Sequence, residues 1–268
     1  MLIGALQNLV CKTRHGMMQF IILAHSLMGR ISEHMFSPVF GQDDPQHELE
    51  KAHLDQDLGQ MRLILPRSAT DLAAASHEDF GQVVWLRITM DVNTVSLYHR
   101  PQQNPGTVPS DYPNDEECDS TKLLEEGRWQ HCVVAARNTV LSIREVSRVS
   151  TDLMMNPYLA ASIFTCARVL AIEYILSSPT SDTSNTDQEA QRRQELREDL
   201  EIMVLIFERL CETFGGVLEK FRVGLLYQLR LDAASVRAVK AGGTRGLLES
   251  CGKWPMARDI EGLEGIPD

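Results

Sequence analysis

The sequence predicts an all-α fold: a single multi-helix, bundle-like domain with flexible polar insertions. Apolar residues recur at steps of three and four along most of the 268 residues, which places them on one face of each helix. Proline, glycine or an N-cap residue marks most of the expected helix ends. No convincing strand pattern and no short repeat occurs. The apolar stripes can therefore be buried only against one another, as in a helical bundle.

Two amphipathic helices are predicted in the first quarter of the chain. Pro38 ends the first and Pro66 ends the second, because proline cannot continue a helix. Their apolar stripes, in chain order, are Phe20, Ala24, Leu27, Ile31 and Met35, then Leu54, Leu58, Met61 and Leu65.

The segment from Phe80 to Arg100 carries conflicting local signals. It is rich in Val, Ile and Thr, which favours a strand. Its length of about twenty residues favours a helix, because strands usually run to about ten residues at most. Apolar side chains lie both on and outside a helical row, so a central, buried helix is predicted. That row is Phe80, Val84, Ile88, Val92 and Val95.

Residues 102–120 are predicted to form a long loop, because prolines, a glycine and an acidic cluster crowd this stretch. The next helix is expected to begin between Asp119 and Thr121, which suit the N-cap position. Its apolar stripe is Trp129, Val133, Ala136, Val140, Ile143 and Ser147.

Three more helices are predicted further along the chain. Asn156 suits an N-cap and Pro157 the first helical position, so a core helix is expected to begin there. A flexible polar linker is expected at 177–191. Gly215 suits the left-handed cap of the following helix. The stripes are Leu159, Ile163, Ala167, Leu170 and Tyr174, then Leu196, Leu200, Met203, Phe207, Leu210 and Phe214, then Leu218, Phe221, Leu225 and Leu229.

The predicted domain boundary lies where this periodicity fades. Residues 1–231 are expected to form the helical domain, and 232–268 a loosely ordered C-terminal tail. The apolar run "MMQFIILAHSLMG" is too short to span a bilayer, and the N-terminus lacks the basic region of a signal peptide. No membrane segment is therefore expected.

The net charge of −11 argues against this chain gripping a phosphate backbone by itself, because nucleic-acid binders concentrate Lys and Arg. Six scattered cysteines contain no C-x-x-C pair, which indicates reduced thiols in an intracellular protein and no structural zinc. Cys132 and Cys166 lie within apolar stripes, where cysteine behaves as a small hydrophobe. No catalytic, cofactor-binding or metal-binding residue is predicted.

Two stretches contain residue types that could carry out chemistry. Asp43, Asp44 and Glu48 in "DDPQHE" superficially resemble the aspartate-rich magnesium motif of all-α terpene synthases, but Pro45 interrupts the cluster and no second metal motif follows. In "VSLYHRP", His99 and Arg100 could form an acid–base or phosphate-binding pair. Cations followed by proline are also typical of a helix C-terminus, and this structural interpretation is preferred.

Five segments, in order, resemble the fungal transcription factor middle-homology region. This is the all-helical regulatory domain found C-terminal to Zn₂Cys₆ DNA-binding clusters. The resemblance covers roughly residues 27–214. Its segments are "LMGRISEHMFSP" (Leu27 to Pro38), "LGQMRLILPRSATDL" (Leu58 to Leu72), "VVWLRITMDVNTVSLYHRP" (Val83 to Pro101), "CVVAARNTVLSI" (Cys132 to Ile143) and "NPYLAASIFTCARVLAIEYI" (Asn156 to Ile175).

The chain departs from that family in two ways. Met61 stands where the family usually has an aromatic residue, which preserves bulk and apolarity. The six-cysteine cluster, of type C-x₂-C-x₆-C, appears nowhere in the sequence. The resemblance therefore implies the regulatory half only. Zinc and DNA contacts are expected only in a DNA-binding module that this chain lacks, whether the chain is a fragment or a shortened member.

The resemblance implies a non-enzymatic domain in the nucleus that regulates transcription by RNA polymerase II. Expected partners are proteins of the transcription machinery, a second copy of the chain, or a small-molecule effector. An effector site is expected between core helices, with walls on the helices that contain Trp85, Trp129 and Phe164. Two alternatives stay open: a magnesium-dependent all-α enzyme of terpene-synthase type, and a truncated interaction protein that does not bind DNA.

Overall fold

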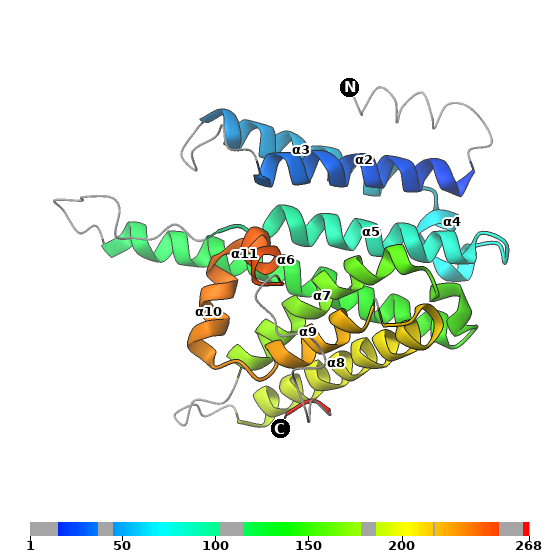
Figure 1. Ribbon diagram of the computed structural model, residues 1–268. Coiled ribbons are helices and arrows are strands. Elements are labelled where there is room, and N and C mark those ends of the chain that lie inside the picture. The colour runs from blue at the N-terminus through cyan, green and yellow to red at the C-terminus, as the bar shows by residue number, and fades with distance from the viewer. Residues whose placement is uncertain are drawn as a thin grey trace.

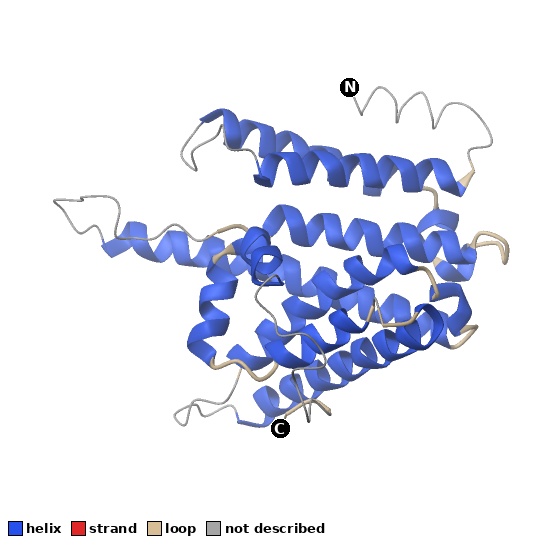
Figure 2. Cartoon of the chain, viewed as in Figure 1, coloured by secondary structure: helices blue, strands red, loops and turns tan. Residues whose placement is uncertain are grey.

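The computed structural model describes residues 16–36, 45–101, 115–177, 186–216, 218–251 and 265–267. Within these ranges the regular structure is helical and no β-strand forms, as Figure 2 shows. The all-α prediction is confirmed. The helices lie in layers, with α2 and α3 on one side of α5, and α8 and α9 on the far side of α6 and α7 (Figure 1).

Helices α2 (Met17–Phe36) and α3 (Pro45–Ile64) lie side by side and cover α5 (Figure 1). Their predicted apolar stripes are buried, except for the partly exposed Met35 and Leu65. Asn93 of α5 donates from its amide to the Ala24 carbonyl of α2, at 3.0 Å. This buried polar contact fixes the rotation of α2 over the core. Pro38, the predicted end of the first helix, lies outside the described residues.

Helix α5 (Phe80–Tyr98) is the central helix of the molecule. The short helices α4 (Arg67–Thr70) and η1 (Leu72–Ala74) lead into it, and it packs against α2, α3, α6 and α7. Nearly every side chain from Val83 to Leu97 is buried. The competing strand signal of Val, Ile and Thr is overridden, because a helix of this length buries β-branched side chains on all of its faces.

Helices α6 (Asp115–Ser147) and α7 (Pro157–Leu176) pack on α5 and on each other, with the short helix η2 (Thr151–Met154) between them. The Asn156 side chain caps α7 by accepting from the Tyr158 N–H at 3.0 Å, as predicted. Within the described residues, α7 alone is long and apolar enough to cross a membrane. Neighbouring helices bury most of it, as is typical of a core helix.

Helices α8 (Thr186–Phe214) and α9 (Glu219–Gln228) close the other side of the core. Gly215 has φ of +76° and its N–H bonds to the Cys211 carbonyl, which confirms the predicted left-handed cap. Phe164 of α7 meets Phe207 and Phe221 at ring-centroid distances of 6.0 and 5.0 Å. This aromatic cluster joins the three helices.

Two helix starts differ from the prediction. Helix α6 begins at Asp115, ahead of the expected 119–121, because no proline or glycine interrupts the intervening residues. Helix α8 begins at Thr186, inside the segment expected to be a linker. Asp187 and Glu189 lie in its first turn, where the helix dipole stabilises negative charge. The rest of the predicted loop and linker, 102–114 and 178–185, lies outside the described residues.

The expectation of a loosely ordered tail is wrong for residues 233–251. They form α10 (Ala233–Ala241) and α11 (Gly243–Cys251). Asp232 caps α10 by accepting from the Ser235 N–H at 2.9 Å, and Val236 and Leu247 are fully or almost fully buried. Each helix has only nine residues and glycines join the two, so the apolar pattern is short and the sequence signal is weak although the helices dock. Residues 252–264 and 268 lie outside the described part.

Candidate functional site

Helix α6 turns one row of side chains outward between α5 and α8. Val134 is 56% exposed and Leu141 is 50% exposed, with exposed Asn138 between them. Their spacing of four and three residues places all three on one helix face. We name Val134, Asn138 and Leu141 the α6 ridge. Exposed aliphatic side chains on a helix that also builds the core are candidates for contact with a partner.

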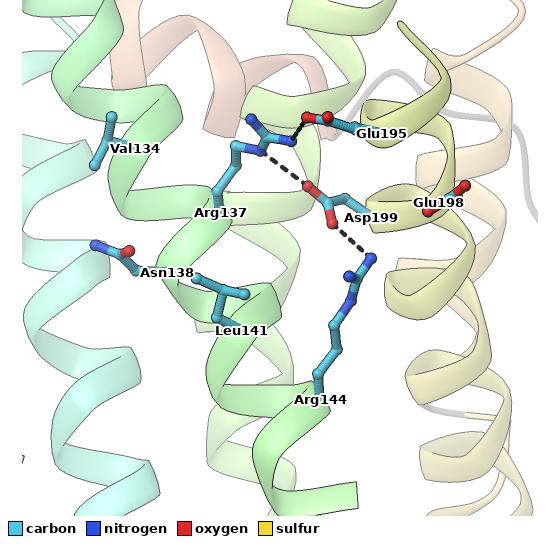
Figure 3. Close-up of a pocket in the computed structure, with 8 residues that line it drawn as sticks. All are labelled: Val134, Arg137, Asn138, Leu141, Arg144, Glu195, Glu198 and Asp199. Carbon is cyan, nitrogen blue, oxygen red and sulfur yellow. Dashed lines mark hydrogen bonds and ion pairs between the residues drawn. The ribbon is translucent and has the colours of Figure 1, made fainter. Parts of the chain in front are cut away.

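A groove of about 490 Å³ lies between this ridge and α8. Figure 3 shows Arg137 and Arg144 of α6 reaching toward Glu195 and Asp199 of α8. Arg137 bonds Glu195 at 2.8 Å and Asp199 at 3.1 Å. Arg144 bonds the second oxygen of Asp199 at 2.9 Å. One nearly buried carboxylate thus holds two arginines that stand two helical turns apart.

The electrostatics of this groove favour recognition of charge. Ion pairs with Glu195 and Asp199 raise the pKa of Arg137, so that guanidinium stays charged. Arg137 in turn lowers the pKa of Glu195. The Glu195 side chain is largely exposed, so a partner's carboxylate can exchange with its ion pair to Arg137 at little cost, whereas the nearly buried Asp199 keeps both arginines in place.

A second cavity, of about 280 Å³, lies on the other side of the ridge between α3, α4, α5 and α6. We name it the Asp91 cavity. Asn138 borders both cavities, so the ridge separates two adjoining depressions. The Asp91 cavity is lined by Arg62, Leu65, Ala69, Thr70, Leu86, Arg87, Met90, Asp91 and Asn138.

Asp91 is the most perturbed acid in this part of the molecule. Burial raises the pKa of its carboxyl to about 7, against the charges of Arg62 and Arg87 and a hydrogen bond from Thr139, which lower it. A carboxyl that is about half protonated near neutral pH, in a cavity, has the properties of a functional group. The sequence contains a signal for this site, because Asp91 is the one acidic residue of a mostly apolar helix.

The stretch "VSLYHRP" ends α5 at Tyr98, so a helix does end within it, but His99 and Arg100 lie beyond the last turn in which they were expected. The expected cationic role of His99 is wrong. Burial lowers the pKa of His99 to about 4, so the imidazole is neutral at pH 7. Its Nε2 lies 3.0 Å from the Lys240 carbonyl, which makes it a donor to α10. Arg100 pairs with Glu48 of α3.

The structure describes only part of the stretch that resembles a magnesium motif. Asp43 and Asp44 lie outside the described residues. Glu48 belongs to α3, where the ion pair with Arg100 contributes to lowering the pKa of its carboxyl. No group of three or more His, Cys, Asp or Glu side chains in the described part is placed to hold a metal ion.

Cys132 and Cys166 are buried in the core of α6 and α7. Burial raises the pKa of Cys132 to about 12 and that of Cys166 further still. Both thiols therefore stay protonated at neutral pH. A nucleophilic cysteine needs a lowered pKa, so the prediction of two small core hydrophobes agrees with their surroundings.

The effector site was expected on the helices that contain Trp85, Trp129 and Phe164. Two of these helices, α5 and α6, border the Asp91 cavity, but the three aromatic side chains line neither of the two cavities. Trp85 meets His25 edge to face at 5.6 Å and stacks on Tyr158. Trp129 is buried and donates from its indole N–H to Glu173 at 2.7 Å. Phe164 belongs to the aromatic cluster with Phe207 and Phe221. These rings fill space between the helices.

Comparisons of this chain with models of protein families, with curated proteins and with solved structures find no match.

Proposed function

We propose that this chain is a regulatory and interaction domain of a fungal transcription factor of the zinc-cluster type. It acts in the nucleus on transcription by RNA polymerase II, through protein contact and without catalysis. In this proposal DNA is bound by a zinc module outside the chain. The observation that supports the contact role is the α6 ridge with the charged groove beside it.

The ridge and groove have the composition of a protein interface. Aliphatic side chains at Val134 and Leu141 supply an apolar centre, and arginines and carboxylates supply a polar rim. An amphipathic partner helix would lay its apolar face along the ridge. Its carboxylates would pair with Arg137 and Arg144, whose planar guanidinium groups suit two-point recognition of carboxylates.

A reporter experiment tests this proposal. The chain is fused to an unrelated DNA-binding domain in a fungal host, and transcription from the cognate promoter is measured. Val134→Glu with Leu141→Glu is expected to abolish the effect of the fusion, because two carboxylates would interrupt the apolar centre. Ile22→Glu is the matched control, because Ile22 is 61% exposed but lies on α2.

The reporter results can be compared if all variants show the same far-UV circular dichroism, which indicates that they are folded alike. Loss in the ridge variant alone supports the proposal. A fusion without any effect on the reporter, or equal activity in ridge and control variants, contradicts it. Salt-sensitive DNA binding by the purified chain would also contradict it, because the proposal assigns phosphate contacts to another module.

A further inference from the structure

The Asp91 cavity brings together two guanidinium groups, a carboxyl group and an apolar wall. Arg62 enters from α3, and Arg87 and Asp91 come from α5. Both arginines are close enough to Asp91 to lower the pKa of its carboxyl. The apolar part of the lining is Leu65, Ala69, Leu86 and Met90. Ligand sites are typically of this kind, with a mainly apolar wall and a few convergent polar groups.

The protein fills only part of the hydrogen-bonding capacity of the Asp91 carboxyl. Among the described residues its carboxyl accepts one hydrogen bond, from the Thr139 hydroxyl at 3.3 Å. That hydroxyl has a single proton, and it also lies 3.4 Å from the Ala135 carbonyl and 3.4 Å from the Cys166 sulfur. A buried carboxyl normally has its hydrogen-bonding capacity filled. Asp91 therefore has capacity left for a molecule in the cavity.

The two arginines also have donors to spare. Arg62 donates to the Thr94 hydroxyl, and the described residues give it no carboxylate within ion-pair distance. Arg87 donates one N–H to Glu145 at 2.7 Å, and Glu145 is itself 48% exposed. Each guanidinium has five N–H donors. Two partly unused guanidinium groups over an apolar wall suit an anion with an apolar body.

We propose that the Asp91 cavity binds a small organic carboxylate, whose carboxylate group is held by Arg62 and Arg87 and whose apolar body packs on Leu65, Leu86 and Met90. Asp91, in its protonated form, donates a hydrogen bond to the bound acid. The cavity volume of about 280 Å³ limits the ligand to a compact molecule. This inference does not rest on the proposed transcriptional role, since it concerns binding by the isolated chain.

Binding of an anion should depend on pH with a definite sign. The groups that face Asp91 are Arg62 of α3, Arg87 of α5, Thr139 of α6 and Cys166 of α7. Burial raises the pKa of the Cys166 thiol, which stays protonated over the neutral range, so the charge of the Asp91 carboxyl sets the pH dependence. Ionised Asp91 repels a carboxylate, so affinity rises as pH falls through about 7.

Titration of the full chain with phenylacetate, followed by calorimetry or NMR, tests the proposal. We expect saturable binding near pH 6, with a dissociation constant of about 1 mM or tighter, as suits a small ligand. Near pH 8 the affinity should be about tenfold lower, because Asp91 is then mostly ionised. Phenylacetamide, which has the same shape without the charge, should bind at least about tenfold more weakly.

Three variants assign the effects to residues. Asp91→Asn keeps a donor without titrating, so binding near pH 6 should persist and the pH dependence should fall below about twofold. Arg62→Gln and Arg87→Gln should each weaken phenylacetate about tenfold or more. Arg209→Gln, on the exposed face of α8, is the control and should bind as the wild type does.

Several results would overturn the proposal. These are binding of phenylacetate weaker than about 1 mM near pH 6, equal affinity for the amide, or unchanged pH dependence in Asp91→Asn. Wild-type affinity in both arginine variants would overturn it as well. The comparison of acid with amide and of the two pH values uses wild-type protein alone, so the test stands even if a variant fails to fold.

Discussion

Asp91 and His99 are buried titratable residues of the same helical segment, and their pKa values move in opposite directions. Burial is the largest cause in both cases, because it disfavours the charged form: it raises the pKa of the Asp91 carboxyl to about 7 and lowers that of the His99 imidazole to about 4. Between pH 4 and 6.5 the folded chain holds an extra proton at Asp91, and the unfolded chain holds an extra proton at His99. Their effects on stability therefore oppose each other in that range.

His99→Gln should reduce the sensitivity of stability to mild acid. Neutral His99 contributes to the free energy of unfolding above its ordinary pKa of 6.5. This contribution is lost as pH falls toward 4, because His99 is protonated at a higher pH in the unfolded chain than in the folded chain. Between pH 7 and 5 the wild type should lose about 2 kcal/mol more than the variant. Gln keeps a donor for the Lys240 carbonyl and does not titrate. Urea unfolding at both pH values measures the difference, and identical losses would contradict the assignment.

Asp91→Asn should stabilise the protein in alkaline buffer. The protonated Asp91 carboxyl contributes to the free energy of unfolding, and this contribution is complete below about pH 4. It is lost as pH rises through about 7, because the folded chain must then ionise a buried carboxyl. The variant should gain up to about 4 kcal/mol near pH 8 and little near pH 4. Urea unfolding across this range checks the prediction. A loss of stability at both pH values would show that the fold needs the Asp91 carboxylate.

At the scale of elements, the C-terminus of α5 is locked to α10 and α11. The Thr244 N–H bonds to the His99 carbonyl at 2.8 Å, and Pro101 forms a bridge with Gly242. Gly243 makes this possible: its φ is +62°, and a Cβ there would lie 2.4 Å from the Pro101 nitrogen. The stretch that looked like a catalytic pair is therefore a junction between helices.

Gly243→Ala should loosen this junction. The left-handed backbone and the contact with Pro101 should together cost at least about 2 kcal/mol of unfolding free energy. Gly29→Ala is the control, because Gly29 lies on the exposed face of α2 with nothing within 4 Å of the added Cβ. It should be neutral or stabilising by up to about 1 kcal/mol, since alanine is the better helix former. Equal stability of the two variants would contradict the role given to Gly243.

At the scale of the whole molecule, α10 and α11 complete the core. Arg168 of α7 is only 2% exposed and donates to Gln228 of α9, to the Leu247 carbonyl and to the Ser250 hydroxyl of α11. Lys240 lies 4.3 Å over the Trp129 ring. Buried arginine is costly unless its donors are satisfied. The last helices therefore belong to the same folding unit as the rest.

Truncation after Asp232 should destabilise the whole domain. It removes the Leu247 and Ser250 partners of Arg168 and uncovers the end of α5. A buried charge that loses its partners costs about 3–5 kcal/mol, so the truncated chain should unfold at lower urea or lose cooperative unfolding. Arg237→Ala, on the exposed face of α10, should stay within about 0.5 kcal/mol of wild type. If the truncated chain is as stable as the wild type, the prediction of a loosely ordered tail would be correct after all.

Much of the fold could be predicted from the sequence, because the apolar face of a helix follows directly from the spacing of apolar residues along the chain. The rows through Leu27, Ile88 and Leu170 are buried as predicted. Helix starts were less accurate, since α6 and α8 begin in polar stretches where no apolar residue marks the helix. Helices α10 and α11 were missed because each is only nine residues long, so its apolar pattern is short.

The candidate sites depend on a different kind of information. Asp91 could have been singled out as an acid inside an apolar helix, but its cavity is built by residues from four helices. The pairing of Asp199 with Arg137 and Arg144 requires the relative rotation of α6 and α8. By itself the sequence determined which helix faces are apolar, because that pattern is local. Only the tertiary structure decided where charges meet and where space remains, because a cavity exists only after several helices have packed.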